Sequence, residues 1–332
     1  MYKLGNLDIR SKVVLAPMAG ITSFGYRKFM SQFGLGYVVT EMVSDMGLIY
    51  GNKETKSYIE FEKLNCPTGV QLFGNSPENM AKAVQIAEKL NENIDFFDVN
   101  MGCPVNKVVD TGAGSALMKN PKLCGDIIRA MKAVTNKPIT VKIRLGFEKD
   151  NLTFLEVIKE VSEAGAALVT IHPRTRKEMY AGQPHWELVK DLRKKIYIPL
   201  VVSGNIYTVD DAIKALEITG ADAVMVARGG VGNPTLIKNI NSYFEGREIV
   251  KTDLDSQIKY CYELARDLID EKGEALAMRV YRGICTKFFD GFPNSKQLKN
   301  RLTLELNNFD DLTRLLEEYR SWYLSYISEQ QS

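Results

Sequence analysis

One short segment of the chain has residue types that can deliver a proton to a bound substrate: Asn100-Met101-Gly102-Cys103-Pro104. Glycine and proline on either side of Cys103 favour a loop just past an apolar run, which lifts the side chain out of a core. A thiol with a pKa of about 8.5 is mostly protonated at neutral pH and can act as a general acid. Many cysteines are inert buried side chains, but this position favours catalysis. We therefore predict that Cys103 is a catalytic acid.

Other polar residues end apolar runs and would present hydrogen-bond donors to a polar ligand. Lys142 and Arg144 alternate along one run, so both side chains point to the same side. The amide of Gln71 suits the edge of a heterocycle. His172 ends another run, and a purely structural histidine remains an alternative there. The first run would place its backbone beneath the ligand at Pro17, Met18 and Ala19.

Two turns that contain glycine predict a phosphate site. They are Ser203-Gly204-Asn205 and Ala227-Arg228-Gly229. Glycine turns expose backbone N–H groups, and Arg228 adds a charge-assisted hydrogen bond; alternatively, the glycines only close tight turns. A phosphate beside a flat ring with several donors indicates flavin mononucleotide (FMN). Pyridoxal phosphate, with Lys142 as its Schiff base, is the competing interpretation, but it leaves the other polar groups without a role.

These residues lie on or just after eight apolar segments that we predict to be strands. Segments with helical periodicity separate the predicted strands. Eight strand-plus-helix units in about 240 residues predict a (β/α)₈ TIM barrel, whose functional residues gather at the carboxyl ends of the strands. A doubly wound sheet is disfavoured, because the first run ends in no glycine-rich dinucleotide fingerprint. The predicted strands are Val13–Met18, Tyr37–Val43, Thr68–Phe73, Phe96–Met101, Ile139–Arg144, Leu168–His172, Leu200–Gly204 and Ala223–Ala227.

The pattern becomes entirely helical after Gly246. We predict a catalytic barrel at residues 1–246 and a small all-helical C-terminal domain at residues 252–332. Residues 275–301 hold six basic side chains and one acid, a local charge of +5. A solvated helix face is the ordinary interpretation of such a run, and a nucleic-acid surface is the alternative. The basic residues are Arg279, Arg282, Lys287, Lys296, Lys299 and Arg301.

Composition limits the possible partners. The chain has 43 Lys and Arg against 41 Asp and Glu, so a polyanion must be met by a local patch. Five cysteines without a Cys-x-x-Cys pair, together with two histidines, predict neither a metal site nor a disulfide framework. No apolar run approaches 18 residues, so we expect no membrane span. A cytoplasmic location and a monomer are the expectations.

Together these motifs resemble the tRNA-dihydrouridine synthases, most closely the bacterial B-type branch. The resemblance covers about residues 10–235, and the segment around Cys103 is its most specific part. The other matching stretches are Ala16–Thr22, Thr40–Met42, Gln71–Gly74, Gly114–Met118, Val141–Gly146 and Thr170–His172.

The resemblance implies an activity and roles for particular residues. FMN would lie at the barrel mouth on the residues named above, and NADPH would reduce it. Hydride would pass from reduced FMN to C6 of a uridine in the tRNA D-loop, and Cys103 would protonate C5. The target base would have to leave its stack. Asn100, Arg144 and Arg174 would bind the uracil, while Arg279, Arg282 and Lys287 would contact the tRNA.

The sequence leaves two alternative functions open. A small-molecule flavin reductase of the dihydroorotate dehydrogenase type would have no need for the basic helical tail. A non-catalytic tRNA-binding barrel would have no need for Cys103, Lys142 and His172, all of which are present.

Overall fold

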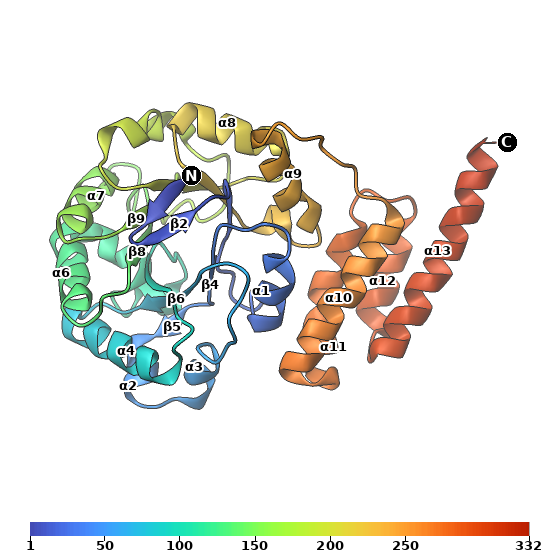
Figure 1. The fold of residues 1–332 in the computed structure, drawn as a ribbon, viewed down its shortest axis with the longest axis horizontal. Coiled ribbons are helices and arrows are strands. Elements are labelled where there is room, and N and C mark those ends of the chain that lie inside the picture. Colours follow the sequence, from blue (N-terminus) through green and yellow to red (C-terminus); the bar gives the residue numbers. More distant parts are fainter. Residues whose placement is uncertain (332) are drawn as a thin grey trace.

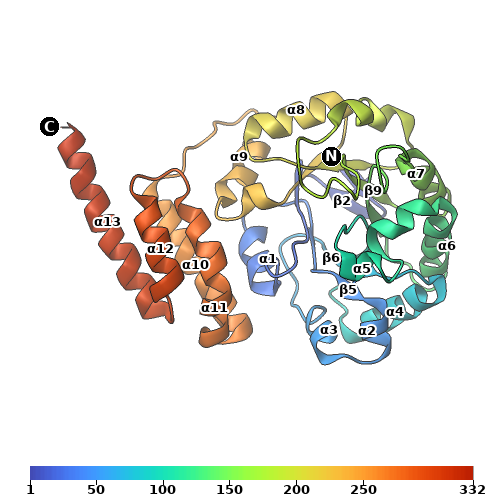
Figure 2. The ribbon, with the colours of Figure 1, turned by 180° about the vertical axis from the view of Figure 1, so that it is seen from behind.

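The computed structural model describes residues 1–331 and contains a barrel of parallel strands followed by a helical region (Figures 1 and 2). The order of hydrogen-bonded neighbours is β3-β11-β10-β9-β8-β7-β6-β4, and β5 also pairs with β6. This confirms the predicted (β/α)₈ barrel. The strands are β3 (Val13–Leu15), β4 (Val38–Val39), β5 (Val43–Ser44), β6 (Thr68–Phe73), β7 (Phe96–Met101), β8 (Ile139–Arg144), β9 (Leu168–His172), β10 (Leu200–Ser203) and β11 (Ala223–Val226).

The first and second strands close the barrel. The N–H of Gly36 donates to the carbonyl of Val13 (2.8 Å), and the N–H of Leu15 donates to the carbonyl of Tyr37 (3.3 Å). The prediction of one continuous second strand over Tyr37–Val43 was wrong, because the structure divides it into β4 and β5. The backbone breaks where the Thr40 hydroxyl donates to the carbonyl of Glu41 and accepts from the N–H of Gln71. A side chain there replaces a ladder hydrogen bond.

Helices surround the barrel, and their starts follow the predicted capping residues. Ser76, Asn120 and Thr208 each accept a hydrogen bond from a first-turn N–H group. The barrel helices are α1 (Phe24–Ser31), α2 (Asp45–Ile49), α3 (Lys53–Ser57), α4 (Pro77–Leu90), α5 (Asn106–Val109), α6 (Pro121–Lys132), α7 (Phe154–Glu163), α8 (Val209–Thr219) and α9 (Pro234–Phe244).

The prediction of a helix in every unit was wrong for the connection between β9 and β10. Only two short 3₁₀ turns form there, at Trp186–Val189 and Leu192–Lys195. Pro184 has no N–H to donate, and Asp191 is in the left-handed conformation (φ 54°), so no α-helix can run through either position. The rest of the connection is a long loop over the barrel mouth.

An N-terminal hairpin closes the opposite end of the barrel and was not predicted. Its strands β1 (Tyr2–Leu4) and β2 (Leu7–Ile9) have three residues each, too few for an alternating pattern to be recognised. Tyr2, Leu4 and Ile9 are buried in a cluster with residues from the barrel strands. The hairpin therefore leaves the carboxyl ends of the strands as the open face.

The C-terminal region consists of helices, and its first helix packs against the barrel (Figure 1). Glu271 accepts hydrogen bonds from the Ser23 hydroxyl (2.7 Å) and the N–H of Gly25 (2.8 Å) at the start of α1. Lys28 and Asp267 form an ion pair across the same contact (2.8 Å). These bonds fix the region beside the barrel mouth. Its helices are α10 (Leu254–Lys272), α11 (Glu274–Cys285), α12 (Ser295–Glu305) and α13 (Phe309–Gln331). Within residues 1–331, no helix combines the length and apolarity of a membrane span.

Candidate active site

A cavity of about 400 Å³ opens at the carboxyl ends of the barrel strands. Every residue predicted to bind the cofactor or the uracil lines it, and so does the predicted catalytic acid. The structure therefore brings together residues that lie as far apart as 17 and 229 in the sequence. They are Pro17, Met18, Ala19, Gln71, Asn100, Cys103, Lys142, Arg144, His172, Arg174, Ser203, Gly204, Asn205, Ala227, Arg228 and Gly229.

The cavity is strongly cationic. Lys142, Arg144, Arg174 and Arg228 line it, and no described residue of the lining carries a carboxylate. Two acids outside the lining act on these cations: Asp98 attracts Lys142, and Glu178 attracts Arg174. A cavity with four cations and no lining anion is suited to a ligand with negative charge. The donor set therefore fits a phosphorylated planar cofactor such as FMN.

His172 is neutral and has a defined tautomer. Burial lowers the pKa of His172 well below its ordinary value, and Arg144, Lys142 and other nearby cations lower it further. Its Nε2 lies 2.9 Å from the Nη1 of Arg174. A guanidinium only donates, so Nε2 accepts and the ring proton is on Nδ1. His172 can then offer a neutral N–H donor to a ligand, as predicted for cofactor binding.

The two predicted phosphate turns require glycine. Gly204 has a φ of 128°, and a Cβ there would lie 3.0 Å from the ring of His172. A Cβ on Gly229 would lie 2.0 Å from the carbonyl oxygen of Ile206, which no side chain could tolerate. Arg228 contacts the rings of Tyr180 and Tyr207 at 5.4 and 5.9 Å from their centroids, without a carboxylate partner among the described residues. Its charge is therefore free to meet an anion.

The loop that carries Cys103 is held from two sides. The Oδ1 of Asn100 accepts from the N–H groups of Gly102 (3.1 Å) and Cys103 (2.8 Å). The carbonyl of Cys103 accepts from the N–H of Ser115 (3.0 Å). Gly114 lies so close that a Cβ would be 3.0 Å from that carbonyl oxygen. The thiol thus lines the cavity on a rigid loop, which is what positioned proton transfer requires.

Arg144 and Arg174 line the cavity and also hold the long loop over it. Arg144 donates to the carbonyls of Gly102, Thr175 and Met179, and Arg174 donates to those of Ala181 and Gly182. The two residues are only 2% and 1% exposed. Most of their N–H groups are therefore engaged with the protein, and their contact with a uracil stays a prediction.

Tyr180 is a cavity residue that sequence reasoning missed. It lies on the same loop, 52% exposed, with its ring stacked on His172 and in contact with Arg144 and Arg228. The sequence signal was the length of the segment between β9 and the first 3₁₀ turn, because long loops at the functional end of a barrel are commonly lids.

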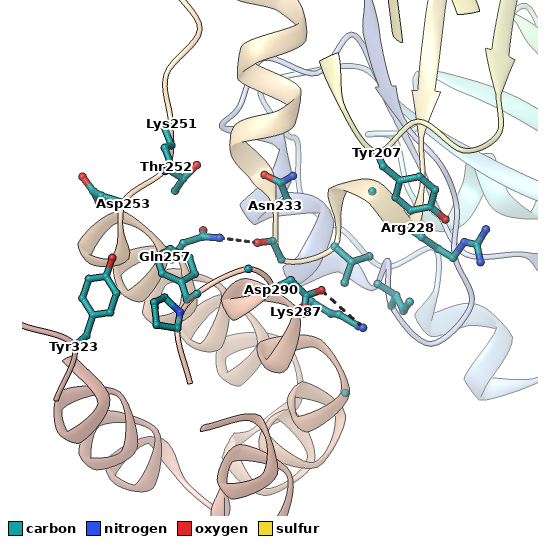
Figure 3. A pocket seen from close by; sticks show the side chains of 18 residues that line it. Tyr207, Arg228, Asn233, Lys251, Thr252, Asp253, Gln257, Lys287, Asp290 and Tyr323 are labelled. Atoms are coloured by element: carbon teal, nitrogen blue, oxygen red, sulfur yellow. Dashed lines mark hydrogen bonds and ion pairs between the residues drawn. The ribbon is translucent and has the colours of Figure 1, made fainter. Parts of the chain in front are cut away.

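A larger cleft of about 1200 Å³ separates the barrel mouth from the helical region (Figure 3). It shares Ile21, Tyr207, Arg228 and Gly229 with the cavity, so the two spaces adjoin each other. Lys287, one of the predicted RNA contacts, lines the cleft. A polymer lying in the cleft would therefore lie beside the cavity.

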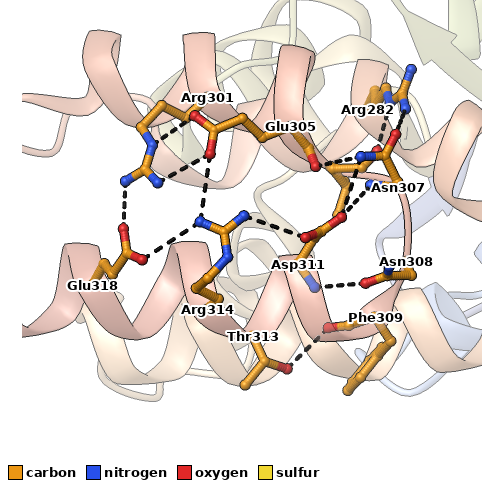
Figure 4. Close-up of polar contacts among 11 residues, drawn as sticks. Arg282, Arg301, Glu305, Asn307, Asn308, Phe309, Asp311, Thr313, Arg314 and Glu318 are labelled. Carbon is orange, nitrogen blue, oxygen red and sulfur yellow. Dashed lines mark hydrogen bonds and ion pairs between the residues drawn. The ribbon is translucent and has the colours of Figure 1, made fainter.

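The basic stretch of the helical region has fewer free cations than its sequence charge suggested. Arg282 donates to the carbonyl of Leu306 (2.7 Å) and to Asn307 (2.8 Å), so it joins α11 to the turn before α13 (Figure 4). Arg301 pairs with Glu305 and Glu318, and Lys299 pairs with Asp290. Arg279 lies on the exposed part of α11. Lys287 also lies 4.0 Å from Asp290. The predicted contacts of Arg279, Arg282 and Lys287 with a tRNA stay predictions, and Arg282 is the one whose guanidinium already has partners within the helical region.

The affinity of the cavity for FMN is expected to fall by up to about tenfold between pH 7 and pH 9. Burial and Arg144 lower the pKa of Lys142 to about 8, so Lys142 loses its charge over this range while the phosphate stays ionised. Titration of FMN by fluorescence at constant ionic strength measures this change. In Lys142→Met the pH dependence should disappear; an unchanged slope in that variant would show that another group titrates.

The architecture and the site define a (β/α)₈ barrel with a cationic cavity at its open face and an attached helical region. The chain belongs to the dihydrouridine synthase family, whose model matches residues 14–320.

The relatives agree with this assignment. A probable tRNA-dihydrouridine synthase from Rickettsia bellii is 32% identical over 97% of this chain and 98% of its own length. tRNA-dihydrouridine synthase B from Pasteurella multocida is 31% identical over 91% of each chain. Among solved structures, the old yellow enzyme homologue of Zymomonas mobilis covers 76% of this chain and 94% of its own, with 15% identity and a TM-score of 0.48.

Proposed function

We propose that the chain is a B-type tRNA-dihydrouridine synthase that uses FMN and NADPH to reduce the C5=C6 bond of a uridine in the D-loop of tRNA. The observation that carries the proposal is the position of Cys103 in a cationic cavity that adjoins a larger cleft lined by both the barrel and the helical region. Family membership supports the substrate.

The residues that would hold FMN follow from the cavity. The turns at 203–205 and 227–229 would take the phosphate, with Arg228 as its free cation. Lys142, Gln71 and the Nδ1–H of His172 would donate to the ring system above the backbone of residues 17–19. Bound FMN, once reduced, would supply the hydride for C6. The protein would supply position and one proton, which are the contributions expected of a protein around a redox cofactor.

Cys103 would give its proton to C5 as the hydride reaches C6, so that one C=C bond becomes two C–H bonds and a thiolate remains to be reprotonated by solvent. Asn100 has one N–H free for the uracil, since its other polar groups are engaged. Tyr180 at the cavity entrance offers a ring on which a displaced base could stack.

The helical region at residues 252–332 would dock the tRNA. Lys251 and Lys287 line the cleft, and Arg279 is exposed nearby on α11. A base held in the cleft must leave its stack to reach the cavity. The cleft adjoins the cavity at Ile21, Tyr207, Arg228 and Gly229, so the displaced uridine would pass from one to the other beside these residues.

Incubation of the purified chain with an unmodified tRNA transcript and NADPH tests the proposal directly. We expect a yellow protein and formation of dihydrouridine in the D-loop, detected by mass spectrometry of nuclease fragments. A colourless preparation that binds tRNA would instead support a non-catalytic barrel. A yellow enzyme that oxidises NADPH and leaves the tRNA unmodified would support a small-molecule reductase.

A further inference from the structure

A chain of buried hydrogen bonds runs from the barrel interior to the Cys103 loop. The Nε2 of Gln71 donates to the Oδ2 of Asp98 (2.7 Å), and the Nδ2 of Asn100 donates to the Oε1 of Gln71 (2.8 Å). The Oδ1 of Asn100 then accepts from the N–H of Cys103 (2.8 Å). Asp98, Gln71 and Asn100 are 4%, 0% and 7% exposed, so water cannot replace a lost bond cheaply.

The direction of this chain is fixed at both ends. A carboxylate can only accept, so Gln71 must turn its NH₂ group toward Asp98 and its carbonyl toward Asn100. Asn100 must then turn its own NH₂ toward Gln71. At the other end, the backbone N–H of Cys103 can only donate, so it requires the carbonyl of Asn100. Both ends impose the same orientation on the two amides.

Asp98 is the origin of the chain and lies outside the cavity lining. Its other oxygen accepts from the hydroxyl of Thr140, a hydrogen bond that is separate from the chain. Burial raises the pKa of Asp98, and the hydrogen bonds from Thr140 and Gln71, with the charge of Lys142, oppose that rise. The residue cannot touch a ligand in the cavity and can act only through its neighbours.

We propose that Asp98 is a positioning residue whose acceptor-only carboxylate sets the direction of the Gln71–Asn100 amide chain and thereby holds the Cys103 loop at the cavity. A consequence concerns the ligand. Because the carbonyls of Gln71 and Asn100 are committed inward, each amide presents only an N–H group to the cavity. The link to catalysis rests on the proposed function, whereas the link to loop geometry does not.

Exchanging the acid and the amide tests the direction of the chain. In Asn100→Asp, Gln71 lies between two carboxylates. Its NH₂ group can donate to one of them, but its carbonyl then faces the other, so one hydrogen bond of the chain is lost. In the double variant Asp98→Asn/Asn100→Asp the chain can reverse. The carboxylate introduced at position 100 then accepts from Gln71 and from the loop, and the amide introduced at position 98 donates to Gln71. We expect the Tm of the double variant to exceed that of Asn100→Asp by about 3 °C or more.

The rate at which Cys103 is alkylated measures how firmly its loop is held. With iodoacetamide and peptide mapping by mass spectrometry, we expect Cys103 to react roughly threefold or more faster in Asn100→Asp and to return toward the wild-type rate in the double variant. If the double variant is no more stable than Asn100→Asp and its thiol reacts equally fast, the directed chain is wrong. Both measurements use the purified full chain and hold even if the tRNA activity is absent.

The variant Asp98→Leu tests whether the hydrogen-bond chain affects turnover of tRNA. Loss of the acceptor should lower kcat on tRNA by about 10- to 100-fold, because small displacements of a catalytic group are costly. KM should change less than about twofold, because the cleft is untouched. Thr140→Val is the matched control: it removes the other bond to Asp98, keeps the chain, and should stay near wild type in both constants. A large loss of kcat in Thr140→Val, or a change in KM alone in Asp98→Leu, would overturn the proposal.

Discussion

Cys103→Ala is expected to reduce the rate of uridine reduction by about 10²- to 10⁴-fold, the usual contribution of a general acid. Cys103 is the only thiol that lines the cavity among the described residues, and the other four cysteines are buried elsewhere. Alanine removes the proton donor and leaves the cations and both glycine turns in place. The variant should therefore bind FMN and accept electrons from NADPH at wild-type rates, measured by absorbance of the flavin under anaerobic conditions.

Cys66→Ala is the matched control for this experiment. Cys66 is buried outside the cavity, so its replacement should leave uridine reduction intact. Full turnover of tRNA by Cys103→Ala would assign the proton to another group. Loss of flavin reduction in the same variant would place Cys103 in cofactor binding instead of proton transfer.

Arg174→Met is expected to destabilise the protein by roughly 2–4 kcal/mol and to weaken retention of FMN at least tenfold. Arg174 donates to Ala181, Gly182 and Asn205 and bonds to His172, so one side chain joins the loop over the cavity to a phosphate turn. Methionine fills much of the same volume without any donor. Thermal melting and FMN titration measure the two effects.

Arg176→Met provides a control on the same loop. Arg176 is partly exposed, bonds to Asn106 and contacts the ring of Phe147, away from the cavity lining. Its replacement should cost about 1 kcal/mol or less and leave FMN affinity unchanged. Equal losses in both variants would indicate general loosening of the loop. Normal FMN affinity in Arg174→Met would show that the phosphate turn holds its shape alone.

The barrel and most of its site could be predicted because their signals are local. Strands β6 to β9 have the predicted bounds, since fully buried parallel strands are continuous apolar runs. Once these runs are placed in order, barrel geometry alone brings their carboxyl ends together. This is why Cys103, Lys142 and Gly204, which the sequence placed at one face, line the same cavity.

The features that the sequence did not predict depend on contacts between segments that are distant in the chain. The division of the second strand depends on the hydroxyl of Thr40, and the loss of free charge at Arg301 depends on Glu318 in another helix. The direction of the amide at Gln71 depends on what lies at each end of a chain of three side chains.

The sequence by itself determined the barrel and the end of the barrel at which Cys103 and the other predicted site residues gather. Only the tertiary structure decided which polar groups are free to meet a ligand and which are consumed in holding loops. The physical reason is that strand and helix patterns arise from near neighbours in the chain. Hydrogen-bond partners are instead assigned by proximity in space, where each donor and acceptor can be used only a limited number of times.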